Sequence, residues 1–237
     1  MTFAEKVIIF NRNLDFRNRL PDGIRIMNPF IESPEALRVS ELFYRKYYND
    51  NKPRRIILGI NPGRFGAGIT GITFTDTKRL ADECGIYTKG FNSHETSSVF
   101  IYDLIKGFGG PGKFYDRYYI NSVCPLGFVK TNSKGREVNY NYYDDKELTD
   151  VSMEFIIRSL TSQLSFGIQR DVAFCLGTGD NFRFLGILNE KLKLFERIIP
   201  LEHPRFIMQY RLKRKEDYIE RFIRFLNDNS ATSETTD

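Results

Sequence analysis

The sequence predicts an α/β fold, a three-layer α/β/α sandwich with a central, four-stranded and mainly parallel sheet. Four short apolar runs have the continuous hydrophobicity of buried parallel strands, and they lie at residues 54–60, 118–123, 171–176 and 197–201. A helical pattern follows each run, at about residues 96–108, 147–166, 178–193 and 209–227. Strands and helices that alternate in this way imply right-handed crossovers between parallel strands.

Two further helices are predicted before the first strand. Thr2 and Glu5 have the spacing of a capping box, and apolar residues recur behind them at helical intervals. Ser33 suits the N-cap of a second helix, because Pro34 then occupies the first helical position, and the pattern continues to about Tyr48. We expect both helices to pack alongside the sheet.

The chain length of 237 residues fits one domain, since α/β folds of this size often form a single unit. We expect the domain to span residues 1–226 and to be followed by a polar, disordered tail at 227–237. Hydrophobic residues make up 41% of the chain and charged residues 27%, which is typical of a globular protein with a sizeable core. The formal net charge of +5 weakly favours a polyanionic partner.

The composition argues against several classes of protein. The chain has three cysteines without a Cys-x-x-Cys pair and only two histidines, so neither a disulfide framework nor a zinc site is expected. Its N-terminus does not resemble a signal peptide, and no stretch approaches the roughly 18 apolar residues of a membrane span. We therefore expect a cytoplasmic monomer that has no membrane partner, metal or organic cofactor.

Polar side chains lie at the ends of three of the four predicted strands. Asn61 follows the first strand, Asn121 lies in the second, and His203 follows the fourth. Because ligands of open α/β sheets bind beyond the carboxyl ends of the strands, we expect these side chains to meet at one edge. Each residue also has a structural interpretation, as a turn residue for the asparagines and as a surface residue for the histidine.

The motifs at these strand ends resemble those of a known family. They are Asn-Pro-Gly-x-Phe-Gly at 61–66, Thr-Gly-x-x-Phe at 70–74, Asn-x-x-Cys-Pro-Leu at 121–126 and His-Pro at 203–204. In this order they resemble the single-strand-selective monofunctional branch of the uracil-DNA glycosylase superfamily, and most closely its bacterial relatives. The resemblance covers residues from about 54 to 205, and the short His-Pro motif is its least specific part.

This resemblance implies an enzyme of base excision repair. It would flip a nucleotide out of single-stranded or duplex DNA and hydrolyse the N-glycosidic bond of uracil, or of 5-substituted uracils such as hydroxymethyluracil. No cofactor is implied, and the lack of a cysteine cluster argues against the iron–sulfur branches. Two alternatives stay open: a module that binds uracil-containing DNA without cleaving it, and a hydrolase of free nucleotides that uses the glycine-rich loop for phosphates.

The resemblance also implies roles for the three strand-end residues. The carboxamide of Asn121 would pair with the N3–H and O4 edge of uracil. His203 would donate a hydrogen bond to O2, where negative charge grows as the bond breaks. Asn61 would hold the attacking water but has no basic form near neutral pH, so the mechanism should be largely dissociative.

Further substrate contacts are expected from the glycine-rich segment between the first strand and Phe74. Phe74 would stack on the flipped base, although in a chain with 21 Phe it could equally be a core residue. The backbone of this segment would form the pocket wall, since glycines permit close approach. The substrate-binding residues implied by the resemblance are Gly63, Phe65, Gly66, Thr70, Phe74 and Asn121.

DNA contacts are expected just after His203, where the sequence departs from the family pattern. Animal members resemble His-Pro-Ser-Pro-Arg-Asn there, whereas this chain has His-Pro-Arg-Phe-Ile-Met. Arg205 and Phe206 are the candidates for a wedge that fills the gap left by the flipped base. Pro204 and Arg211 complete the predicted DNA-binding set, and a basic cluster at 211–215 could contact phosphates or form a solvated helix face. Residues 132–145 are interpreted as a surface loop.

Overall fold

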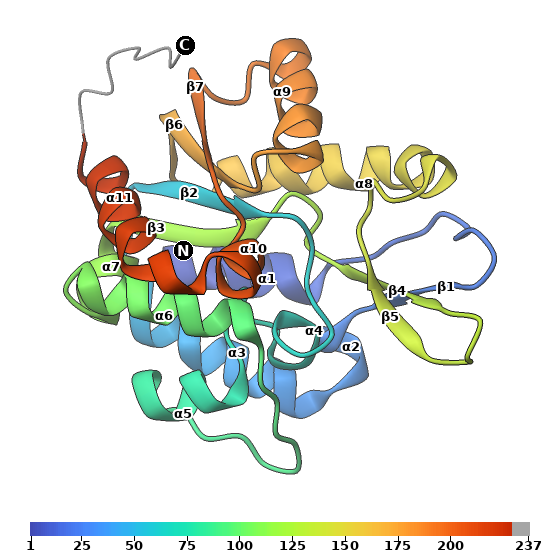
Figure 1. The fold of residues 1–237 in the computed structure, drawn as a ribbon, viewed down its shortest axis with the longest axis horizontal. Helices are drawn as coiled ribbons and strands as arrows, with labels where there is room; N and C mark the ends of the chain where they lie inside the picture. Colours follow the sequence, from blue (N-terminus) through green and yellow to red (C-terminus); the bar gives the residue numbers. More distant parts are fainter. Residues whose placement is uncertain (229–237) are drawn as a thin grey trace.

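The structure, a computed structural model that describes residues 1–228, confirms the predicted fold class (Figure 1). Its main sheet has four parallel strands in the order β3-β2-β6-β7. Their bounds are Arg54–Gly59 for β2, Tyr118–Ser122 for β3, Ile168–Leu176 for β6 and Arg197–Leu201 for β7. Of the predicted tail, residues 229–237 lie outside the described part of the chain, and the last helix includes Asn227.

Six long helices flank this sheet, and five shorter helices and one 3-10 turn connect them. The long helices are α1 (Phe3–Arg12), α3 (Pro34–Tyr47), α6 (Thr96–Gly107), α8 (Lys146–Leu164), α9 (Asp180–Leu192) and α11 (Lys215–Asn227). The short ones are α2 (Pro29–Glu32), α4 (Ala67–Thr70), α5 (Thr77–Cys84), α7 (Pro111–Arg117), α10 (Pro204–Tyr210) and the 3-10 turn η1 (Leu212–Arg214).

The two N-terminal helices begin as the sequence predicts. Thr2 and Glu5 form a reciprocal capping box at the start of α1. The hydroxyl of Ser33 accepts the backbone N–H of Ala36 at the start of α3, and Pro34 is the first residue of that helix. These caps satisfy backbone groups that a helix N-terminus leaves unpaired.

Neighbouring tyrosines in β3 tie the sheet to helices on both of its faces. Tyr119 contacts Phe3 of α1 edge-to-face, with ring centroids 5.3 Å apart. Tyr118 points the opposite way, as consecutive strand residues must, and its hydroxyl donates to the Leu226 carbonyl in α11. The buried core therefore extends to both sides of β3, as expected for a strand covered on two faces.

The structure corrects the interpretation of residues 132–145 as a surface loop. A second, antiparallel sheet has the order β1-β4-β5, formed by Ile24–Met27, Gly127–Thr131 and Glu137–Tyr140. It stands beside the main body, at the right of Figure 1, on the side to which β3 leads. The strand β5 has largely exposed side chains, so it lacks the alternating hydrophobic pattern by which a half-buried strand is recognised.

The predicted helix at about 209–227 is also corrected. It is divided into α10, which already begins at Pro204, the turn η1, and α11. The break lies at Arg211, whose φ of −133° is not helical. No glycine or proline marks this position in the sequence, so the usual signals of a helix end were absent.

Candidate functional site

A cavity of about 150 Å³ lies at the carboxyl edge of the main sheet. We call it the central cavity. Its walls come from the segment after β2, the start of α6, the end of β5 and the start of α10. The residues that line it include Asn61, Gly63, Thr73, Phe74, Glu95, Asn139, His203 and Arg205. At about 30 Å³ per water molecule, the cavity would hold about five waters, so a single pyrimidine ring is of suitable size.

Asn61 lies two residues beyond β2, and its carboxamide is held in one orientation. Its Nδ2 donates to the carbonyl of Tyr140 at 3.2 Å, and its Oδ1 accepts the backbone N–H of Tyr142 at 3.2 Å. Tyr140 is the last residue of β5 and Tyr142 follows it, in a part of the chain that the sequence analysis had not connected with the site. The amide retains one N–H and one lone pair that could contact a ligand or a water.

His203 is the N-cap of α10 and lines the central cavity. Its Nδ1 accepts the backbone N–H of Arg205 at 3.2 Å, which leaves the proton of a neutral imidazole on Nε2. Burial lowers the pKa of His203 to about 4, and the nearby charge of Arg205 contributes in the same direction. His203 is therefore a neutral hydrogen-bond donor at neutral pH.

Phe74 closes a third side of the central cavity. Its ring centroid lies 5.8 Å from that of His203, and its edge covers Gly59, where an added Cβ would come within 2.9 Å of the ring. The backbone of Phe74 has a φ of +54°, which is uncommon for a bulky residue and costs of order 1 kcal/mol or more. Strain of this kind is concentrated at functional sites, which favours a binding role over simple core packing.

Asn121 does not line the central cavity. It lies in a smaller space next to it, and Thr73 contacts both. The Asn121 Oδ1 accepts the N–H of Ser122 at 2.8 Å and the hydroxyl of Thr73 at 3.5 Å, while Nδ2 donates to the Tyr119 hydroxyl at 2.7 Å. The structure therefore brings Asn61, Phe74 and His203 together and places Asn121 one side chain away from them.

The glycine loop, residues 63–71, packs directly against Glu95, a residue that the sequence analysis missed. A Cβ added to Gly66 would lie 2.1 Å from Glu95 Oε2, and one added to Gly63 would lie 2.9 Å from Oε1. The loop can thus approach the carboxyl only because these positions lack side chains. Glu95 immediately precedes α6 and carried no sequence signal beyond its place before a predicted helix.

Burial raises the pKa of Glu95 to about 7. The hydrogen bond from the Ser98 hydroxyl (3.0 Å) and the charge of Arg205 oppose this rise, and the charge of Asp76 adds to it. A carboxyl that titrates near neutral pH thus borders the same cavity as His203 and Asn61. Perturbed groups of this kind are concentrated at functional sites.

Two other residues of the glycine loop face away from the central cavity. Thr70 is fully buried behind the loop, where its hydroxyl donates to the carbonyl of Thr75 at 2.7 Å. Phe65 is 49% exposed and lies in a neighbouring groove. The glycines 66, 68 and 71 have the Gly-x-Gly-x-x-Gly spacing, but they lead into the four-residue α4 rather than the long helix of a dinucleotide-binding unit.

The predicted DNA-binding residues cluster on α10 and just beyond it. Pro204 is buried as the first helical residue, whereas Arg205 and Phe206 are exposed. The guanidinium of Arg211 lies 5.3 Å from the Phe206 ring, and the exposed ring of Tyr210 lies 5.6 Å from it. This aromatic and cationic patch adjoins the central cavity through Arg205.

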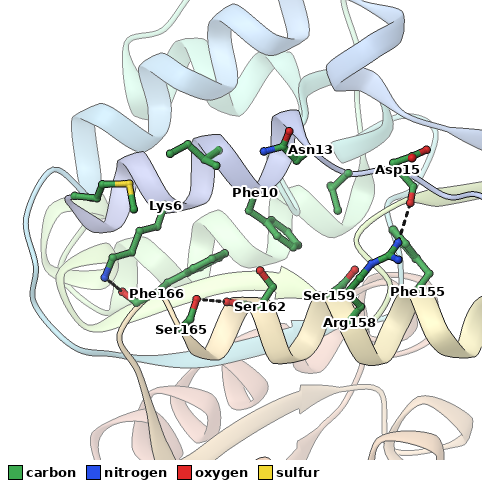
Figure 2. Close-up of a pocket in the computed structure, with 13 residues that line it drawn as sticks. Lys6, Phe10, Asn13, Asp15, Phe155, Arg158, Ser159, Ser162, Ser165 and Phe166 are labelled. Atoms are coloured by element: carbon green, nitrogen blue, oxygen red, sulfur yellow. Dashed lines mark hydrogen bonds between the residues drawn. The ribbon is translucent and has the colours of Figure 1, made fainter.

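A second groove, of about 330 Å³, lies between α1 and α8 (Figure 2). Figure 2 shows Phe10 and Phe166 beside it and Ser159 and Ser162 along α8. None of the motifs identified in the sequence contributes to it. Some of its polar groups bond to nearby backbone, for example Lys6 Nζ to the Phe166 carbonyl at 3.2 Å. The residues that the sequence singled out thus lie at or near the central cavity rather than at this groove.

Residues 1–228 contain no group of three or more His, Cys, Asp or Glu side chains placed to hold a metal ion. No helix in this part of the chain has the length and apolar character that crossing a membrane requires.

Comparisons with known proteins show the family to which the chain belongs. The family model described as uracil DNA glycosylase superfamily matches residues 45–227. The crystal structure of wild-type Pedobacter heparinus SMUG2 is similar to this chain, with a TM-score of 0.93 and 55% sequence identity over 95% of this chain and 97% of that one. No curated protein matches the chain.

Proposed function

Because the chain belongs to the uracil-DNA glycosylase superfamily, it is a uracil-DNA glycosylase of base excision repair, and we propose that its chemistry takes place in the central cavity. The observation that carries this proposal is the convergence of Asn61, Phe74 and His203 on one space of pyrimidine size. The flipped uracil stacks on Phe74, and the sugar lies at the mouth of the cavity.

His203 stabilises the leaving group. As the C1′–N1 bond breaks, its electron pair passes to the base, and the negative charge spreads to O2. The Nε2–H of a neutral His203 donates a hydrogen bond to this oxygen. A pKa of about 4 fits this role, because the imidazole keeps the same form across the neutral range and is held in place by the Arg205 N–H.

Asn61 positions the water that completes the reaction. Its carboxamide, fixed by the backbone of Tyr140 and Tyr142, orients the water toward C1′ but cannot take its proton. The sugar therefore develops oxocarbenium character before water attacks. The oxygen of water forms the new bond to C1′, and its proton is released to solvent as the uracil anion departs.

Asn121 reads the base. Its Oδ1 accepts from N3–H and its Nδ2 donates to O4, which excludes cytosine because the donor and acceptor are reversed there. The role requires Thr73 to move aside or to contact the base itself. Uracils with a substituent at C5, such as hydroxymethyluracil, are further proposed substrates.

On DNA, Arg205 and Phe206 form the wedge, and Arg211 contacts phosphate. Both single-stranded and duplex substrates are proposed, acted on by a monomer. Location in the cytoplasm is proposed on the three free, buried cysteines, which fit a reducing compartment.

The experiment is an oligonucleotide assay with alkali to reveal abasic sites. Single-stranded and duplex DNA carrying one uracil, hydroxymethyluracil or thymine are compared, and uracil release is expected on both forms. Tight binding without abasic sites would instead favour a non-catalytic module. Cleavage of free nucleotides alone would favour the nucleotide hydrolase, an alternative that none of the findings supports.

A further inference from the structure

A groove of about 420 Å³ opens next to the central cavity. We call it the side groove. Its lining residues include Arg64, Phe65, Glu95, Val138, Asn139 and Arg205. Glu95, Ser97, Asn139 and Arg205 line both spaces, so the two spaces adjoin. The proposed function assigns no ligand to the side groove.

Its floor is an exposed aromatic ring with a cation stacked on it. Phe65 is 49% exposed, and the guanidinium carbon of Arg64 lies 4.3 Å from its ring centroid. An exposed phenylalanine is costly to leave in water, and nothing in the described structure packs over its free face closely enough to bury it. A planar ligand that stacked there would bury this ring and contact the adjacent cation.

The side groove is also preformed. The backbone N–H of Arg64 donates to Asn139 Oδ1 at 3.0 Å, and its Nη1 donates to the Glu137 carbonyl at 2.6 Å. The glycine loop is thus tied to β5, the edge strand of the small sheet. Val138 of this strand, 40% exposed, also lines the side groove. A ligand would not have to order these elements itself, which increases affinity.

We propose that the side groove holds the nucleotide next to the flipped one in the same DNA strand, with its base stacked on Phe65. The proposal rests on the proposed function, because it takes the flipped base to occupy the central cavity. A neighbouring nucleotide is joined to the flipped one by a single phosphodiester, so it must lie immediately outside that cavity.

The chemistry of the side groove fits a base better than a bare phosphate. Aromatic rings and stacked arginines are the surfaces on which single-stranded nucleic acids place their bases. Arg64 and Arg205 supply positive charge for the phosphodiester that joins the two nucleotides. The Nδ2 of Asn139 adds a donor for a base edge.

The test removes the neighbouring base from the DNA and the Phe65 ring from the protein, first each alone and then both together. Single-stranded oligonucleotides carry one uracil whose 5′ or 3′ neighbour is either thymine or a baseless tetrahydrofuran unit. Uracil release (kcat/KM) and binding by fluorescence anisotropy are measured for the natural chain, Phe65→Ala and Phe65→Tyr. Tyr87→Ala, which removes a ring that is 72% exposed and lines neither space, is the matched control.

When the base is absent on one side, we expect kcat/KM and binding affinity to fall by about 5- to 100-fold, as stacking of one base predicts. This loss is expected for the natural chain, for the Tyr87→Ala control and for Phe65→Tyr. Phe65→Ala should show kcat/KM and binding affinity reduced by a similar factor on the intact strand. Removing the neighbouring base should then cause no further loss in this variant. The proposal is overturned if the natural chain is indifferent to both neighbours, or if Phe65→Ala keeps the full dependence. If the natural chain releases no uracil from any strand, the proposed function fails. The anisotropy measurements still show whether a base stacks on Phe65 in the side groove.

Discussion

The carboxyl of Glu95 should make the stability of the protein depend on pH in the neutral range, and Glu95→Gln should remove that dependence. The pKa of this group is about 7 in the folded protein against an ordinary value of 4.5. Between these two values the folded chain binds one more proton than the unfolded chain. The free energy of unfolding therefore falls as pH rises from 4.5 to 7, and the loss is complete above the folded pKa.

The magnitude follows from the two pKa values. One pKa unit corresponds to 1.36 kcal/mol, so a pKa of about 7 against 4.5 would destabilise the ionised protein by about 3.4 kcal/mol, and by about 2 to 3 kcal/mol once water in the cavity is allowed for. Glutamine has nearly the same shape, keeps an oxygen for the Ser98 hydroxyl, and cannot ionise. Glu95→Gln should thus be more stable than the natural chain by about 2 to 3 kcal/mol at pH 8.5, and by less than about 1 kcal/mol at pH 5.

Urea unfolding at the two pH values measures this difference directly. Glu190→Gln removes an exposed carboxyl on α9 and controls for the loss of one negative charge. The reasoning is refuted if the advantage of Glu95→Gln is equal at pH 5 and pH 8.5, or if Glu190→Gln shows the same pH dependence.

Four further predictions follow from the site and the core. Asn121→Asp should fold normally but release uracil about 100-fold more slowly, the effect of losing one well-placed donor; unchanged kinetics would remove it from the site. Nuclear magnetic resonance should find the pKa of His203 near 4, and only one other histidine is present to confuse the assignment; a midpoint near 6.5 would contradict its burial. Arg211 and Lys213 pair with no carboxylate among the described residues, so replacing both by alanine should reduce the salt slope of DNA binding by about 2; an unaltered slope would exclude phosphate contacts there. Gln163 is fully buried, and its amide has no hydrogen-bond partner in the described chain. Gln163→Met should therefore raise the free energy of unfolding, measured in urea, by about 1 kcal/mol. A decrease in the free energy of unfolding would indicate that a water satisfies the amide.

The main sheet could be predicted from the sequence because each of its strands contains a short apolar run. The run at β2 has four fully buried residues in succession, from Ile56 to Gly59, and this pattern survives without any knowledge of the neighbours. The small sheet could not be predicted, since Val138 and its neighbours in β5 are mostly exposed. Pairing with β4 fixes this strand, and such long-range pairing has no local signature.

The site shows the same division between local and long-range information. Asn61 and His203 could be placed together because both follow predicted strands, and parallel strands end at one edge. Glu95 and Asn139 could not, because they reach the central cavity from the start of a helix and from the unpredicted β5. Their presence depends on the glycine loop, whose close approach to Glu95 becomes visible only when the backbone is folded.

The separation of Asn121 from the central cavity has a physical explanation that links the free protein to its substrate. The Thr73 hydroxyl donates to Asn121 Oδ1 at 3.5 Å, the limit of a hydrogen bond and therefore a weak one. It supplies to Asn121 the kind of donor that the N3–H of uracil would supply, at the same oxygen. A buried carboxamide oxygen needs such partners in the absence of a base, and a linear N–H···O bond from uracil would replace this contact at a net gain. Cytosine, whose N3 carries no proton, could not make the exchange, so on the proposed function Thr73 would add to the discrimination proposed for Asn121.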